Sequence, residues 1–87
     1  MLRITRLFPD GLAVTVKLEG ELVGDWVVAT RDACTIFGRT APRLRLDLAA
    51  VTFVDAAGVR LLRDLLAEGA EIATCSGFVG ELLHRER

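Results

Sequence analysis

The sequence carries few of the side chains that catalysis needs. Among its 87 residues there is no tyrosine and one histidine, His84, close to the C-terminus. A Ser–His–Asp or Cys–His arrangement would have to use His84 as its base, although chain ends are usually poorly ordered. The glycines form neither a GxGxxG motif nor a Walker-type loop, the two sequences that hold phosphates at helix starts. These absences argue against an enzyme.

Cysteine is also scarce. Cys34 and Cys75 form no CxxC motif, and neither has a histidine nearby in the sequence. A metal site would need both cysteines to converge with His84 from separate helices and a strand. We therefore expect buried, reduced thiols rather than a disulfide or a metal site, and we expect no cofactor.

Charge of one sign is not in excess. Eleven basic residues against twelve acidic ones leave a net charge of −1, which gives no general attraction to nucleic acid. Arg39, Arg43 and Arg45 lie close together, but the segment 39–43 has the composition of a solvated loop. We predict no nucleic-acid partner.

Long hydrophobic runs are missing as well. The stretch Leu44–Val54 is interrupted by Arg45 and Asp47 and is too short to span a bilayer. Met1–Leu7 alternates apolar with polar residues and lacks the apolar core of a signal peptide. At this length we expect one soluble cytoplasmic domain that covers residues 1–87.

The patterns that are present begin with a hairpin. Leu2–Leu7 and Leu12–Leu18 both alternate apolar and polar residues, which indicates two strands with one buried face each. Pro9-Asp10-Gly11 between them is a turn signal, because proline presets φ and glycine tolerates positive φ. Arg3 and Arg6 mark the first strand as an outer edge that must resist aggregation.

A helical period follows. Apolar residues recur at intervals of three and four, and Gly38 is a plausible stop: Leu22, Trp26, Ala29, Ala33 and Phe37. Val23, Val27 and Cys34 widen this apolar face. We interpret Trp26 as the anchor that packs this helix on the sheet. The alternative is an exposed tryptophan on a partner surface.

The second half of the chain alternates strands with helices. Leu44–Leu48 indicates a short strand, and a helix begins at Asp55 and ends at Gly69. Glu71–Cys75 is a further strand, after which Ser76 can cap a short last helix. The order β-β-α-β-α-β-α predicts an α/β fold with a mixed sheet of about four strands and about three helices. The sheet would be mainly parallel, with one antiparallel edge strand.

Two linked motifs carry a family resemblance. Leu46-Asp47-Leu48 and then Val51-Thr52-Phe53-Val54-Asp55-Ala56-Ala57-Gly58-Val59 resemble the signature of the STAS domains, the family of the anti-sigma factor antagonists. That family typically shows a strand ending in Asp-Leu and then Asp-Ser-Ser-Gly-Leu at a helix start. Further similar segments lie in order along the chain, at 18–22, 69–72 and 78–83.

The resemblance implies a STAS-like fold and a non-catalytic function in signal transduction and transcription regulation. In the bacterial antagonists, a serine of the Asp-Ser-Ser-Gly segment is phosphorylated by a kinase that is also an anti-sigma factor. The unmodified form binds that partner and releases a sigma factor. A partner of this kinase-like type is therefore one expectation. A constitutive subunit of a transporter, an ATPase or a signalling complex is another, and a binder of small apolar ligands is a third.

The sequence departs from the family at the two serine positions. Ala56 and Ala57 stand there, and a methyl group has no oxygen to phosphorylate. The usual switch, which would add roughly two negative charges at a helix start, cannot operate at these positions. Thr52, Thr74 and Ser76 are the nearest hydroxyls by sequence and the remaining candidates for modification.

The resemblance also predicts where a partner docks. We expect the docking surface to consist of the start and outer face of the second helix: Asp55, Ala56, Ala57, Gly58, Arg60, Arg63 and Asp64. Each of these residues has a structural alternative. Asp55 can cap the helix, Gly58 can allow close backbone approach to a neighbouring strand, and Arg60 can pair with Asp64 one turn away.

Two further expectations concern the third and fourth strands. Asp47 would either hold the turn after its strand or lie near Asp55. After the last helix the family usually continues with another strand and helix, whereas here Arg85-Glu86-Arg87 remains. The edge beside Glu71–Cys75 would then lack its usual cover, and we hypothesise that it serves self-association, as a homodimer, or docking.

Overall fold

Strands and helices alternate in the predicted order. The computed structural model describes residues 1–10, 12–39 and 43–85, without the side chains of residues 8–10, 84 and 85. The elements are β1 (Leu2–Asp10), β2 (Ala13–Leu22), α1 (Asp25–Gly38), β3 (Arg43–Val54), α2 (Ala56–Ala67), β4 (Glu71–Cys75) and α3 (Gly77–Arg85).

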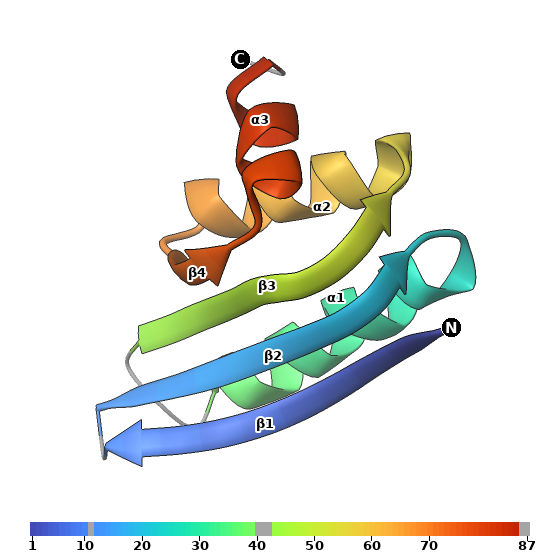
Figure 1. Cartoon of the computed structure of the whole chain (residues 1–87). Helices are drawn as coiled ribbons and strands as arrows, with labels where there is room; N and C mark the ends of the chain where they lie inside the picture. The colour runs from blue at the N-terminus through green and yellow to red at the C-terminus, as the bar shows by residue number, and fades with distance from the viewer. Residues whose placement is uncertain (11, 40–42, 86–87) are drawn as a thin grey trace.

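The strands form one mixed sheet in the order β1-β2-β3-β4 (Figure 1). β1 pairs with β2 antiparallel, with Ile4 opposite Leu18. β3 pairs with β2 in parallel, and β4 pairs with β3 in parallel. β1 is an edge strand on which Arg3 and Arg6 are exposed. The predicted fold class is confirmed.

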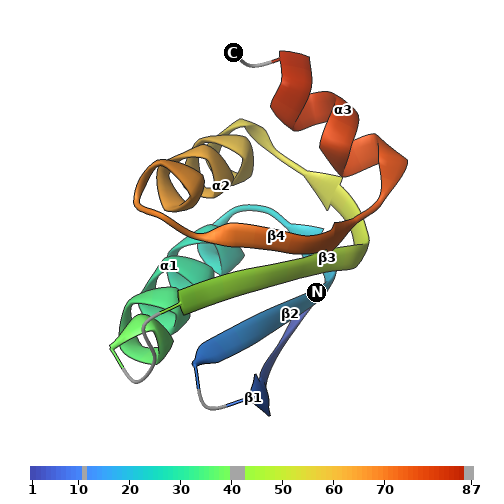
Figure 2. The same ribbon diagram turned by 90° about the vertical axis from the view of Figure 1, so that its left-hand side faces the viewer.

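The core lies between the sheet and the helices. α1 and α2 cover the same face of the sheet, and α3 stands beside α2 at the β4 end (Figure 2). Apolar residues from β2, β3 and α2 are almost completely buried there: Leu18, Leu22, Leu46, Leu48 and Leu62. Within the described residues, no helix is long and apolar enough to cross a membrane.

The predicted apolar face of α1 is confirmed at Val27, Cys34 and Phe37 and is wrong at Trp26. Leu22 is the last residue of β2, and α1 begins only at Asp25, after Gly24 turns the chain with a φ of 55°. The residues that face the core are Val27, Thr30, Cys34 and Phe37. Trp26 is one position off this face and is 38% exposed, so it does not anchor the helix on the sheet.

β3 is longer than predicted. It runs without a break through Leu48 to Val54, whereas the sequence indicated a strand of five residues. The register with β4 shifts after Leu46, and the register with β2 shifts between Lys17 and Glu19. These irregularities let a strand of 12 residues bend while it stays paired.

Several predictions fall on segments that the structure covers in part. Pro9 and Asp10 belong to β1, while Gly11 of the predicted turn lies outside the described residues. The pairing of Asp10 with Ala13 nevertheless confirms the hairpin. Residues 40–42 of the predicted loop, residues 86–87 and the side chain of His84 also lie outside the described part of the chain.

Candidate docking surface

Asp55 organises the start of α2. It is the N-cap residue, and its Oδ1 accepts a hydrogen bond of 2.7 Å from the backbone N–H of Gly58. Its Oδ2 accepts a second one, of 3.0 Å, from the backbone N–H of Gly24. The capping role is thus confirmed, and one carboxylate also ties the start of α2 to the turn before α1.

The same hydrogen bonds fix the charge of Asp55. The N–H groups of Gly24, first, and of Gly58 stabilise the ionised carboxylate and lower its pKa below the usual value. Arg60 contributes a smaller effect in the same direction. Because Asp55 already accepts from the first turn of α2, the helix start carries its own negative charge and has less need of an external anion.

Gly58 lets α2 approach the end of β2. A Cβ atom at this position would lie 2.7 Å from the carbonyl oxygen of Leu22 and 2.7 Å from Cγ1 of Val54. No other residue fits this space without moving backbone. Gly58 is buried, so of its two predicted roles the structure supports the packing one, and its own atoms add little to the docking surface.

The two alanines present methyl groups at the helix start. Ala56 is exposed and Ala57 is half-buried. Both lie in the first turn of α2, directly after the Asp55 cap. The position that the resemblance assigns to phosphorylatable serines is therefore accessible but chemically inert.

The charged residues further along α2 are exposed, but their pairing differs from the prediction. Arg60, Arg63 and Asp64 all face solvent. Asp64 does not pair with Arg60; its Oδ2 lies 3.6 Å from Nη2 of Arg31 on α1. The i,i+4 rule failed here because α1 lies beside α2 and offers a second cation to Asp64.

Two exposed apolar residues lie near the helix start, and the sequence offered only one of them, Trp26, as an alternative. Trp26 follows Gly24 by two residues, and Phe53, which is 49% exposed, precedes Asp55 by two. The Gly24–Asp55 hydrogen bond brings these two segments to the same end of the molecule (Figure 1). The sequence analysis considered an exposed Trp26 as its alternative, but no sequence pattern indicated that Phe53 would be exposed.

Asp47 serves neither of its predicted purposes. Its Oδ1 accepts from the hydroxyl of Thr74 at 2.7 Å and from the N–H of Ala49 at 3.2 Å. The Thr74 hydroxyl is the main cause of its lowered pKa. Asp47 thus joins β3 to β4 in mid-strand, roughly 25 Å of extended chain before Asp55. Its carboxylate holds the register where the strand is irregular.

The other candidate hydroxyls are placed differently. Thr74 is exposed and donates to Asp47, as above. Ser76 caps α3, as predicted, and its Oγ accepts from the N–H of Val79 at 3.2 Å. Thr52 is exposed on β3. The first two hydroxyls therefore take part in bonds that hold the fold.

The cysteines are both free thiols, but they are not both buried. Cys34 is 2% exposed, whereas Cys75 is exposed at the end of edge strand β4, which corrects the expectation for it. Burial raises the pKa of Cys34 from 9.0 to about 11. Among the described residues, no three side chains of histidine, cysteine, aspartate or glutamate gather where they could hold a metal ion.

The buried thiol predicts a change of stability with pH. Below pH 9 the folded and unfolded states both keep the Cys34 proton, and between about pH 9 and 11 only the folded state does. The free energy of unfolding should therefore fall as pH rises through this window. Urea denaturation at pH 8 and pH 10.5 measures it, and Cys34→Ala should lose the effect while Cys75→Ala keeps it. If the free energy of unfolding fell equally between pH 8 and pH 10.5 in the two variants, Cys34 would not be the group responsible.

The comparisons with known proteins give the fold. No protein-family model and no curated protein match the sequence. Among solved structures, the unphosphorylated anti-sigma factor antagonist SpoIIAA aligns with a TM-score of 0.74 and 21% identity, over 97% of this chain and 80% of its own. An anti-sigma factor antagonist from Mycobacterium paratuberculosis aligns with a TM-score of 0.71 and 22% identity, over 83% of this chain and 66% of its own.

A third structure carries the name of the domain. The STAS domain of an anti-sigma factor antagonist from Rhodobacter sphaeroides aligns with a TM-score of 0.56 and 23% identity, over 88% of this chain and 87% of its own. The chain therefore has the STAS-domain fold, as its sequence motifs implied. These three solved proteins are anti-sigma factor antagonists.

Proposed function

We propose that this chain is a non-catalytic, cytoplasmic protein-binding module that acts in the manner of an anti-sigma factor antagonist. The observation that carries the proposal is the start of α2. There, in a fold shared with such antagonists, Asp55 caps the helix and two alanines stand exposed or half-exposed beside it. The docking surface is formed by Asp55, Ala56, Ala57, Arg60, Arg63 and Asp64 around the buried Gly58.

The docking surface is proposed to have one charge state. Ala56 and Ala57 cannot accept a phosphate, and the lowered pKa of Asp55 keeps its carboxylate ionised at neutral pH. A partner that binds this surface is then not released by modification of these two positions. Control of binding would have to act on the amount of this protein or on the partner.

The favoured partner is an anti-sigma factor of the kinase-like type, and the alternative is a constitutive place beside an ATPase, a transporter or another signalling subunit. Both predict a protein at the same surface, so the nature of the captured partner decides between them. The free edge of β4, where Thr74 and Cys75 are exposed, is the second surface to consider, with another copy of this chain as its candidate occupant.

The test is the affinity of a purified partner for a matched pair of variants. The partner is first captured from the source lysate, identified and purified. Ala57→Asp places a charge in the docking surface, and Ala67→Asp places the same charge at the exposed far end of α2. We expect Ala57→Asp to weaken binding at least about tenfold, because the interface would bury an unpaired carboxylate.

The control separates binding from folding. An aspartate in the first turn of a helix is favourable for the helix dipole, so Ala57→Asp should stay folded by circular dichroism. Ala67→Asp should bind like the unmodified chain. Equal affinity of Ala57→Asp and the unmodified chain would refute this surface and direct attention to the β4 edge.

A further inference from the structure

The helix α1 carries a second apolar stripe besides the one that faces the core. Trp26, Ala29, Ala33 and Ile36 recur at intervals of three, four and three, so they lie along one side of the helix. Trp26 and Ile36 are exposed, the two alanines are half-buried, and none of the four packs in the core or against it. We call these four residues the α1 seam. At the usual rise of a helix the seam is about 15 Å long.

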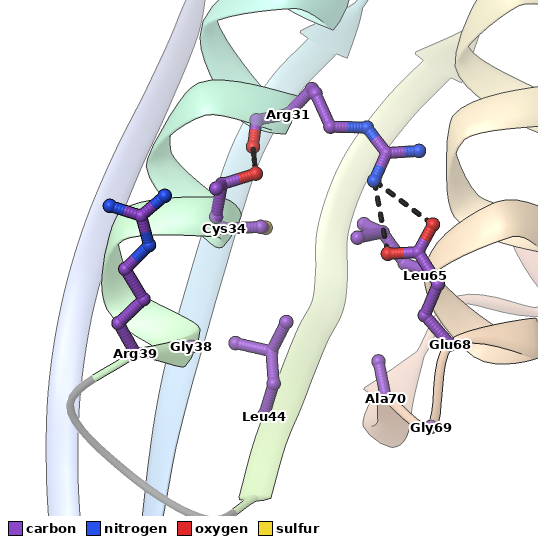
Figure 3. A pocket seen from close by; sticks show the side chains of 10 residues that line it. Arg31, Cys34, Gly38, Arg39, Leu44, Leu65, Glu68, Gly69 and Ala70 are labelled. Atoms are coloured by element: carbon purple, nitrogen blue, oxygen red, sulfur yellow. Dashed lines mark hydrogen bonds and ion pairs between the residues drawn. The ribbon is translucent and has the colours of Figure 1, made fainter.

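The other sides of α1 contact the rest of the same molecule. Cys34 faces the core. Arg31 faces α2, where its Nη1 lies 3.1 Å from Oε1 of Glu68 (Figure 3). Toward β1, the guanidinium of Arg6 lies 5.1 Å from the ring centre of Phe37. At about 100° per residue, Arg31 is on the opposite side of α1 from the middle of the seam. The seam therefore faces away from α2 and toward solvent.

The α1 seam is complementary to a second copy of itself. Its spacing of three, four and three reads the same in both directions, so two antiparallel α1 helices bring Trp26 of each copy opposite Ile36 of the other. Ala29 of each copy then lies opposite Ala33 of the other. Alanine at the centre lets the helix axes approach to about 8 Å, the lower end of the usual range, and the larger end residues fill the space beside it. A two-fold interface requires this kind of self-complementarity.

The charges beside the seam decide between an antiparallel and a parallel pair. Asp25, Asp32 and Arg39 follow one flank of the seam, and all three are exposed. In an antiparallel pair, Asp25 of each copy meets Arg39 of the other, and only Asp32 meets a like charge, its own equivalent near the two-fold axis. In a parallel pair each of the three would meet its own equivalent, so like charges would face each other at every position. The antiparallel pair is therefore favoured.

We propose that a second copy of this chain docks on the α1 seam and that the two copies form an antiparallel, two-fold dimer. Trp26 of each copy packs on Ile36 of the other, and the pairs of Asp25 with Arg39 close both ends. Tryptophan is among the residues that are enriched in protein interfaces. One short pair of helices makes a small interface, so the dimer dissociates on dilution. The proposal rests on α1 alone and does not depend on the proposed function.

Sedimentation equilibrium of the full chain over about a hundredfold range of concentration tests the proposal. We expect the apparent mass to rise toward twice that of the monomer. Ile36→Glu should weaken self-association at least about tenfold, because the seam would bury an unpaired carboxylate. Val28→Glu is the matched control, since Val28 lies on α1 off the seam and is 62% exposed, against 57% for Ile36. It should associate as the unmodified chain does, and both variants should stay folded by circular dichroism.

A charge reversal at low ionic strength tests the register. Asp25→Lys alone brings two cations together at each end and should weaken association at least about tenfold. Adding Arg39→Glu to the same chain restores opposite charges in the antiparallel pair only, so the double variant should regain the affinity of the unmodified chain. A constant monomer mass, an equal loss in Val28→Glu, or a double variant as weak as Asp25→Lys would each overturn the proposal. Association that Ile36→Glu leaves unchanged would overturn it in favour of another surface, such as the β4 edge.

Discussion

Replacing Gly58 with alanine is expected to lower the free energy of unfolding by about 1–3 kcal/mol, the range for overpacking a close-packed interior. The added Cβ would lie 2.7 Å from the carbonyl oxygen of Leu22, which is backbone and cannot swing aside as a side chain can. Either α2 or the end of β2 must shift. Urea denaturation of the purified chain measures the loss.

Gly38 provides the control for this substitution. It also lies in a helix, but a Cβ there would meet nothing within 4 Å. Gly38→Ala should therefore raise the free energy of unfolding by up to about 1 kcal/mol, since alanine is the better helix former. If both variants changed stability in the same direction, the close contact at Gly58 would not be the cause.

Leu62→Ala should have the largest effect of any variant considered, a loss of about 2–5 kcal/mol. Leu62 is 1% exposed and belongs to the core shared by α2 and the sheet, so its removal costs both buried apolar area and a cavity. A domain of this size is stable by only about 4–13 kcal/mol. The variant should show a strongly reduced midpoint in thermal and urea unfolding.

The matched control is Val28→Ala on α1. Val28 is exposed, so removing its methyl groups should change stability by less than about 0.5 kcal/mol. A loss at Val28 as large as that at Leu62 would mean that the exposed face of α1 is covered in solution.

Local patterns in the sequence predicted most of the fold. The alternation in β1 and β2, the helical period of α2 and the caps at Asp55 and Ser76 each depend on neighbours within four residues. Such local patterns are reliable because they do not depend on contacts between distant parts of the chain. The order of elements and the mixed sheet followed from them.

The errors arose where distant parts of the chain decide the outcome. Trp26 was placed on the buried face because Leu22, the last residue of β2, was assigned to the helix, and counting from Leu22 puts Trp26 one turn further along the same face. Asp64 pairs with Arg31, 33 positions away, and Asp47 with Thr74 of the next strand. No spacing within the sequence encodes those contacts.

The geometry around Asp55 could be predicted only in part. Asp55 and its cap could be predicted, because aspartate before an apolar helical stripe is a local signal. The second hydrogen bond of Asp55, to Gly24, could not be predicted, because it depends on how β2 and β3 end side by side. That bond brings the segments of Trp26 and Phe53 together.

The position of Trp26 has a spectroscopic consequence. The chain has no tyrosine, so its near-ultraviolet emission comes almost entirely from this one indole. The indole is partly exposed at the start of α1, beside the turn that Asp55 ties to α2. The intrinsic fluorescence of the unlabelled protein therefore reports on the environment at the start of α1 and on no other part of the molecule. A partner that covers it would shift the emission to shorter wavelength.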